Sequence, residues 1–422
     1  MPKLTNEKKY ILLVDTLHKV RDTLDLDEIL DHLLDSVKTV VNYDAAGIFV
    51  LNPDFPQAKF KTPKPMIAGM IQRGYDIMPI EDDAMLMRGQ GIVGHVILSG
   101  KSVIVPDVHR DGRYVKGRSR TQSEIAVPLT RSGRTIGALN LESNNLSAYN
   151  HDDLEILEFF ADAAAISIEK AMLHRQLLER ELIDKQLQLA REVQSGLFPA
   201  EPPRIPGYDI AGICIPAEEI GGDYYDFIKL PQGGLGIIVA DVSGHGIPSA
   251  LMMTAFRGML RMHVQSRNGV DKMASEINRQ LPEITGDSHF ITAVYAMFDL
   301  KKGEFTYVCC GHRPCLLLHS DGSCNRLDAR GPVLGVFPES NFPAEKIAMN
   351  AGDTLLMYTD GVVERMGRDG VEFGLERLSE LAVKDQNKQA ETLVHSIVRT
   401  VQQYSGSEKF EDDFTLVVVK KT

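Results

Sequence analysis

The chain has 422 residues, of which 43% are hydrophobic and 25% charged, and a formal net charge of −12. This length predicts two or three domains of an ordinary globular protein. The negative charge argues against nonspecific nucleic-acid binding, because Lys and Arg hold phosphate backbones. No run approaches the ~20 apolar residues that cross a bilayer, and the five cysteines lack zinc-site spacing. We therefore expect a cytoplasmic protein with reduced thiols that binds neither nucleic acid nor membrane.

The first part of the chain predicts helices followed by a small mixed domain. Residues 4–41 carry apolar positions at helical spacing, which predicts one or two helices. Short apolar runs between residues 44 and 147, such as AAGIFVL, EIAVPL and TIGALNLE, alternate with Gly, Pro and Asp. This punctuation is typical of short strands joined by turns, so we expect an α+β domain here.

A long helix is predicted next, from residue 152 to about residue 197. The segment contains no proline, and apolar residues recur at steps of four and three, as in Leu157, Ala161 and Ala164. Prolines from Pro199 onward end it. The pattern fits either a domain helix running into a linker or a coiled coil of a dimer. We favour the coiled coil, and we expect it to carry a signal between the domains.

Acidic residues mark the second half of the chain. Asp241 follows the run LGIIVA, Asp360 follows DTLLMYT, and Asp412 and Asp413 precede FTLVVV, while Asp223 lies in GGDYYD. The apolar runs predict core strands. Strands of two packed sheets could bring these carboxylates to one rim, where oxygen ligands suit Mg²⁺ or Mn²⁺. Phosphoryl chemistry is a natural use of such a site.

The N-terminal half resembles a GAF domain, a sensor and dimerisation module. The resemblance covers roughly residues 25 to 172 and is carried by GQGIVGHVILSGKSVIVPDV, IAVPLTRSGRTIGALNLES and YNHDDLEILEFFADAAAISIEKA. It implies an antiparallel sheet with helices and a possible small-molecule ligand of unknown identity. This half has no cysteine, which excludes a thioether-linked tetrapyrrole.

The C-terminal half, about residues 186 to 420, resembles the SpoIIE branch of the PPM protein serine/threonine phosphatases, which are similar to protein phosphatase 2C. The motifs that carry the resemblance appear in family order: AREVQSGLFP, EEIGGDYYDF, IIVADVSGHGIPSALMM, CCGHRPCLLL, AGDTLLMYTDGVVERMG, FGLERL and DDFTLVVV. It implies a sandwich of two antiparallel sheets flanked by helices. CGHRPC departs from the usual AGHNP-like segment at Cys310, Arg313 and Cys315.

The same resemblance implies a site for two divalent cations, Mn²⁺ or Mg²⁺, that activate a water for in-line attack on phosphorus. Asp241 would bridge the ions, with Asp223 as the second aspartate assigned to catalysis. The implied metal ligands are Asp223, Asp241, the carbonyl of Val242, Asp360, Asp412 and, next to the usual ligand, Asp413.

Two histidines keep open roles at this point. His245 is a candidate general acid for the leaving serine oxygen, or it has a hydrogen-bonding role. In the wider family the acid histidine directly follows Asp-Gly, whereas here residues 242–244 intervene. His312 in CGHRP is better explained as structural, although its place at a strand end keeps it a candidate.

We therefore expect an α+β protein in which a GAF domain regulates a metal-dependent serine/threonine phosphatase. The resemblance implies a phosphorylated anti-anti-sigma (STAS) protein as substrate in bacterial stress-response signalling, and a homodimer. The alternatives are a noncatalytic GAF-linked scaffold or a phosphatase of a small phosphorylated metabolite. The expected segments are an N-terminal helical segment (1–24), the GAF domain (25–172), a coiled-coil linker and switch (173–199) and the phosphatase domain (200–422).

Overall fold

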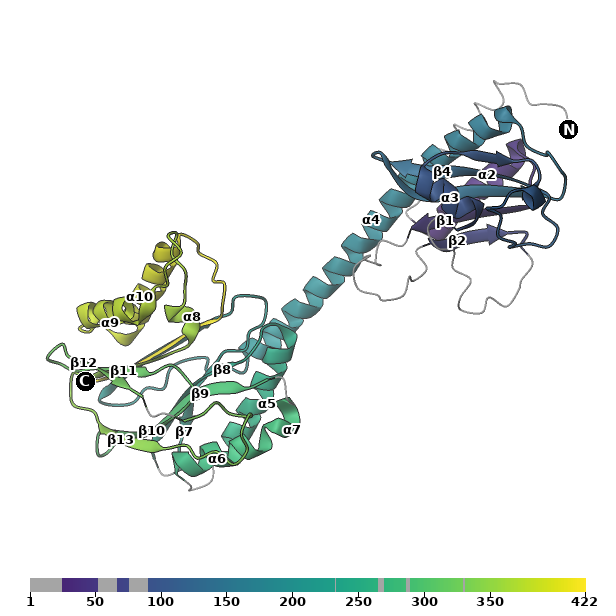
Figure 1. Cartoon of the computed structure of the whole chain (residues 1–422). Helices are drawn as coiled ribbons and strands as arrows, with labels where there is room; N and C mark the ends of the chain where they lie inside the picture. Colours follow the sequence, from purple (N-terminus) through teal and green to yellow (C-terminus); the bar gives the residue numbers. More distant parts are fainter. Residues whose placement is uncertain are drawn as a thin grey trace. The chain divides into compact units, whose positions relative to one another are not determined.

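The computed structural model describes residues 25–51, 67–75, 90–231, 233–264, 269–285, 289–328 and 331–422. The chain forms two compact units, Met1–Leu182 and Ile183–Thr422, which are drawn in Figure 1. Sheets in both units are antiparallel and covered by helices, so the predicted α+β class is confirmed. The helical segment predicted for residues 1–24 lies outside the described residues.

Unit 1 is built on one five-stranded sheet. Its strand order is β2-β1-β5-β4-β3, and neighbouring strands are antiparallel. The strands are β1 (Ala45–Leu51), β2 (Ile67–Arg73), β3 (Val103–Val105), β4 (Ser123–Arg131) and β5 (Arg134–Ser143). The helical parts are α2 (Leu26–Val40), α3 (Gly91–Ser99), the 3₁₀ turn η1 (Val108–Arg110) and the first part of α4 (His151–Ser195).

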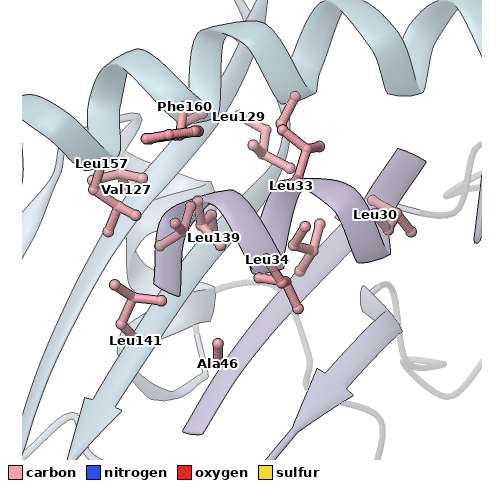
Figure 2. Packing of buried hydrophobic residues seen from close by; sticks show 14 of the residues in the cluster. Leu30, Leu33, Leu34, Ala46, Val127, Leu129, Leu139, Leu141, Leu157 and Phe160 are labelled. Carbon is pink, nitrogen blue, oxygen red and sulfur yellow. The ribbon is translucent and has the colours of Figure 1, made fainter. Parts of the chain in front are cut away.

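The core of unit 1 lies between one face of this sheet and the helices α2 and α4. Figure 2 shows Leu30 and Leu34 of α2 beside Val127 and Leu139 of the sheet and Phe160 of α4. Alternate residues of a strand point to opposite faces, so the residues between these sheet positions face α3. That second face has its own smaller apolar cluster, which includes Phe49, Val96 and Ala138.

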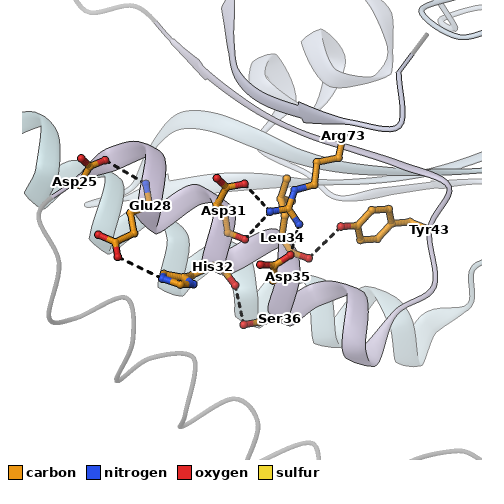
Figure 3. A network of polar contacts seen from close by, with 9 residues as sticks. All are labelled: Asp25, Glu28, Asp31, His32, Leu34, Asp35, Ser36, Tyr43 and Arg73. Carbon is orange, nitrogen blue, oxygen red and sulfur yellow. Dashed lines mark hydrogen bonds and ion pairs between the residues drawn. The ribbon is translucent and has the colours of Figure 1, made fainter.

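Polar contacts fasten α2 to the edge of the sheet. Figure 3 shows Arg73 of β2 reaching two α2 carboxylates, with its Nη2 2.5 Å from Asp31 Oδ1 and an ion pair to Asp35. Asp25 caps the helix, because its side chain accepts the backbone N–H groups of Asp27 and Glu28. These contacts between Arg73 and the α2 carboxylates hold α2 against the edge strand β2.

Unit 2 contains two five-stranded antiparallel sheets. The first has the order β13-β10-β9-β8-β7 and the second β12-β11-β14-β15-β6. The strands are β6 (Tyr208–Ile215), β7 (Tyr224–Lys229), β8 (Leu235–Val242), β9 (Ile291–Asp299), β10 (Glu304–Cys310), β11 (Cys315–Leu318), β12 (Cys324–Leu327), β13 (Ala344–Ala348), β14 (Thr354–Tyr358) and β15 (Phe414–Lys421).

The two sheets of unit 2 pack face to face, and helices cover their outer faces. Val239 and Phe305 of the first sheet share a buried cluster with Met357 and Val417 of the second. The outer layer on the first sheet is α5 (Ile247–His263), α6 (Val270–Gln280) and α7 (Pro282–Thr285). The outer layer on the second sheet is α8 (Asp360–Val363), α9 (Gly374–Asp385) and α10 (Ala390–Ser405).

Helix α4 runs for 45 residues across the boundary between the units. Asn150 begins it, because its side-chain oxygen accepts the backbone N–H groups of Asp152 and Asp153. Leu157 is fully buried in unit 1, whereas Leu178 and Leu189 are more than half exposed. Among the described residues, no helix combines the length and apolar character needed to cross a membrane.

Candidate functional site

The structure brings the five predicted aspartates together at one end of the two-sheet core. Asp241 is the penultimate residue of β8, and Asp223 directly precedes β7. From the second sheet, Asp360 begins α8 just after β14, and Asp412 and Asp413 precede β15. The charges of the three aspartates from the second sheet act on the Asp241 carboxylate, and the charges of Asp241 and Asp413 act on the Asp223 carboxylate.

Clustering changes the protonation of these carboxylates. Burial, and then the charges of Asp360, Asp412 and Asp413, raises the pKa of Asp241 to about 7. Burial also raises the pKa of Asp223 well above its ordinary value, and partial burial raises that of Asp412. The ionised side chains therefore repel one another, and divalent cations would relieve this repulsion.

Asp413 organises the backbone around Asp223. Its two carboxylate oxygens accept the backbone N–H groups of Ala217 at 2.8 Å, Gly222 at 2.7 Å and Asp223 at 3.3 Å. A Cβ atom at Gly221 would collide with this carboxylate. The resemblance implies Asp413 as a metal ligand next to the usual one, and its contacts give it a further role in fixing the loop.

Asp223 is held by a residue that the sequence analysis missed. Thr359 Oγ1 donates to Asp223 Oδ2 at 2.7 Å and accepts the backbone N–H of Thr415 at 3.0 Å. Thr359 is fully buried and directly precedes Asp360. The only sequence signal for Thr359 is its place between MY and DG in the motif. Its hydrogen bond to Asp223 joins segments that are distant in the sequence, so no local pattern predicts it.

The remaining predicted site residues lie at the edge of the cluster. Val242 is buried, and its carbonyl oxygen lies 2.8 Å from the place of a Cβ atom on Gly222. The His245 side chain is 87% exposed, and its Nδ1 lies 3.5 Å from Glu218 Oε1. The ring lies near enough to Asp412 to affect that carboxylate. His245 is therefore a solvent-exposed side chain close to the Asp412 carboxylate.

The donor set fits divalent cations in its chemistry. It supplies carboxylate oxygens and one backbone carbonyl, the ligands that Mg²⁺ and Mn²⁺ prefer. Within the part of the chain that the structure describes, no group of three or more His, Cys, Asp or Glu side chains already has the spacing of a metal cage. Mg²⁺ and ions like it keep several waters and are often bound through only one or two carboxylates, so water would complete the coordination of an ion here.

The last turns of α4 contact the segment that carries Asp223. The Gln194 side chain is buried, and its Nε2 donates to the carbonyl of Gly221 at 2.8 Å. Its Oε1 accepts the N–H of the same residue at 3.2 Å. Phe198 packs near the rings of Tyr224 and Tyr225. The end of α4 is therefore connected to the backbone next to the aspartate cluster.

Two family models match the chain, one in each half. The family described as GAF domain matches residues 23–169, and the family described as Stage II sporulation protein E (SpoIIE) matches residues 231–422. The aspartates at positions 241, 360, 412 and 413 fall inside the second match, and Asp223 lies just before it. Both matches agree with the resemblances carried by the sequence motifs.

Curated relatives include two bacterial phosphoserine phosphatases. The chain is 29% identical over 242 residues to phosphoserine phosphatase RsbU of Bacillus subtilis, covering 57% of this chain and 71% of that protein. It is 29% identical over 184 residues to phosphoserine phosphatase RsbP of the same organism, covering 43% of this chain and 45% of RsbP. Protein IcfG of Synechocystis is 26% identical over 263 residues, which cover 56% of this chain and 41% of IcfG. The chain thus spans less than half of the latter two relatives.

Among solved structures, the SiaA-PP2C domain of Pseudomonas aeruginosa is similar in fold. It matches with a TM-score of 0.51 and 20% sequence identity, covering 57% of this chain and 98% of that domain. At this identity the similarity concerns the fold alone, and it agrees with the two packed sheets of unit 2.

Proposed function

We propose that this chain, which joins a GAF domain to a SpoIIE-type PPM serine/threonine phosphatase domain, is a metal-dependent phosphatase of phosphorylated proteins under GAF control. The observation that carries the proposal is the gathering of the aspartates at one end of unit 2, with pKa values raised for Asp223, Asp241 and Asp412. Carboxylates that repel one another in this way are suited to hold two cations.

Each residue of the proposed site has its own role. Asp241, together with Asp223, the Val242 carbonyl, Asp360 and Asp412, would hold the cations. Bound cations would supply an activated water and neutralise the charge of the phosphoryl oxygens. The exposed His245 could donate a proton to the leaving oxygen of the substrate. Asp413 would hold the backbone that carries Asp223.

The proposed substrate is a phosphorylated anti-anti-sigma (STAS) protein, which rests on the family resemblance. RsbU and RsbP carry the name phosphoserine phosphatase, which supports phosphoserine in a protein as the chemical class. Turnover on such a phosphoprotein should exceed turnover on free phosphorylated metabolites. The reverse preference would favour the metabolite phosphatase instead.

The proposed regulation acts through α4. Gln194 and Phe198 connect the end of this helix to the segment of residues 221–225. A rotation or refolding of α4 would therefore move Asp223 relative to Asp241. We propose that the GAF domain binds a small molecule that drives this change, and that two copies of the chain pair along the exposed leucines of α4.

The test is phosphate release from a phosphoserine protein and an aryl phosphate, with Mn²⁺, Mg²⁺ or chelator. We expect wild-type turnover that needs metal and falls by about 100-fold or more in Asp241→Asn. Asp271→Asn, at an exposed position in the first turn of α6, should behave as wild type. Turnover that persists in chelator or in Asp241→Asn would contradict the proposal.

A further inference from the structure

His312 lies between the two sheets of unit 2, near the aspartate cluster, and uses both ring nitrogens. Its Nδ1 lies 2.7 Å from the hydroxyl of Thr292 on β9. Its Nε2 lies 3.0 Å from the carbonyl oxygen of Tyr358 at the end of β14. The side chain therefore connects a strand of the first sheet to a strand of the second.

These partners fix the form of the imidazole. A carbonyl oxygen can only accept, so Nε2 carries the proton and donates to Tyr358, and Nδ1 accepts from the Thr292 hydroxyl. The residue is 9% exposed. Burial lowers the pKa of His312 to about 4, which keeps the ring neutral and both hydrogen bonds in place at physiological pH.

Each partner stands next to a predicted metal ligand. Thr292 is paired directly with Asp241 in the β8–β9 register. Tyr358 precedes Asp360 by two residues, and Thr359 between them donates to Asp223. His312 thus links the strand beside Asp241 to the strand end that leads into Asp360.

The backbone on both sides of His312 is also fixed. Gly311 has a φ of +64°, which disfavours residues other than glycine, and a Cβ there would meet Val333. The carbonyl of His312 accepts from Cys309 Sγ at 3.2 Å. These contacts hold the backbone that carries the His312 ring.

We propose that His312 is a positioning residue that sets the separation of Asp241 and Asp360, and with it the affinity for divalent cations. This inference rests on the proposed metal site. Since its ring is buried and fully used by Thr292 and Tyr358, His312 acts through these partners and does not reach a substrate. The role distinguishes it from His245.

The experiment measures Mn²⁺ affinity of the full chain by isothermal titration calorimetry, alongside turnover and thermal unfolding. We expect His312→Ala and Thr292→Val to weaken Mn²⁺ binding about tenfold or more, which is the usual effect of removing a hydrogen bond that supports a metal site. Thr292→Ser keeps the hydroxyl and should retain wild-type affinity. The double variant should be no weaker than His312→Ala, because both changes break one link.

The matched control is His319→Ala, which removes a histidine that pairs with Asp353 at the other end of β14, and it should bind Mn²⁺ as wild type does. Thr292→Val preserves shape and keeps His312, so it tests the link even if His312→Ala does not fold. Wild-type affinity in folded Thr292→Val would overturn the positioning role alone. Mn²⁺ binding that Asp241→Asn leaves unchanged would overturn the proposed metal site, and the positioning role with it.

Discussion

Glu124 and Glu142 form a buried carboxylate pair in unit 1. They lie directly opposite each other on β4 and β5. Glu124 accepts from Asn140 Nδ2 at 3.1 Å, and Glu142 accepts from the Tyr75 hydroxyl at 2.6 Å. Burial, followed by the charge of Glu142 and a smaller one from Asp111, raises the pKa of Glu124 to about 8. Glu124 is therefore protonated in the folded protein at neutral pH.

A pH-dependent stability follows from this pair. The folded state holds a proton that the unfolded state releases near the ordinary glutamate pKa, so stability falls as pH rises from about 4.5 to about 8. We expect Glu124→Gln to leave the calorimetric unfolding temperature of unit 1 nearly unchanged at pH 5 and to raise it by about 3 °C or more at pH 9. The exposed Glu155→Gln serves as control. An equal effect at both pH values would contradict the assignment.

Asp412 and Asp413 are neighbours with different predicted effects. Asp413 accepts three backbone N–H groups, whereas Asp412 accepts one, that of Asp413, at 2.8 Å. Asp413→Ala should lower the free energy of unfolding in chelator by about 3 kcal/mol, because it leaves these donors without an acceptor. Asp412→Ala should cost much less stability in chelator, because only one exposed N–H group loses its acceptor, and it should weaken Mn²⁺ binding. Urea unfolding and calorimetric titration measure the two effects, and equal stability losses would refute the distinction.

At the scale of the element, α4 is the connection whose rotation should matter. Insertion of one alanine after Glu179 turns everything beyond it by about 100°, and this includes Gln194, which holds Gly221. Insertion of seven residues restores the orientation to within about 20°. We expect the single insertion to change the basal rate of phosphate release and the seven-residue insertion to change it much less. If both insertions leave the rate at the wild-type value, α4 does not transmit rotation.

The sequence predicts most helices and strands but few of the contacts between residues that are distant in the chain. Apolar residues at helical spacing and the absence of proline before Pro199 predict a helix over residues 152 to 197, and α4 spans His151–Ser195. The run before Asp241 is β8, as expected. The links from Thr359 to Asp223 and from His312 to Tyr358 join residues distant in the sequence. No local pattern specifies such pairs, because strand register is set by the packing of the whole sheet.

At the scale of the whole molecule, exposed leucines on α4 predict self-association. Leu178, Leu182 and Leu189 are 52%, 58% and 61% exposed, and the chain mass is 46.8 kDa. Sedimentation equilibrium should give twice this mass for wild type. Leu182→Glu should shift the molecule toward the monomer, because a charge in an apolar seam loses its solvation.

The matched variant for this test is Arg180→Glu, which adds the same side chain on the same helix outside the leucine positions. It should sediment as wild type. A wild-type mass of one chain at micromolar concentration would contradict the dimer, and a dimer that survives Leu182→Glu would place the interface elsewhere.

Strand β15 sits between β14 and β6 in the second sheet of unit 2, and Phe414 pairs there with Ile215. During synthesis on the ribosome, β6 emerges long before its partner exists. The second sheet can close only after β15 has left the exit tunnel, and the same late segment delivers Asp412 and Asp413 to the cluster. The aspartate cluster can thus form only after β15 has been made, whereas the strands of unit 1 are complete by Ser143 and its core by Ala171 of α4, so unit 1 can fold first.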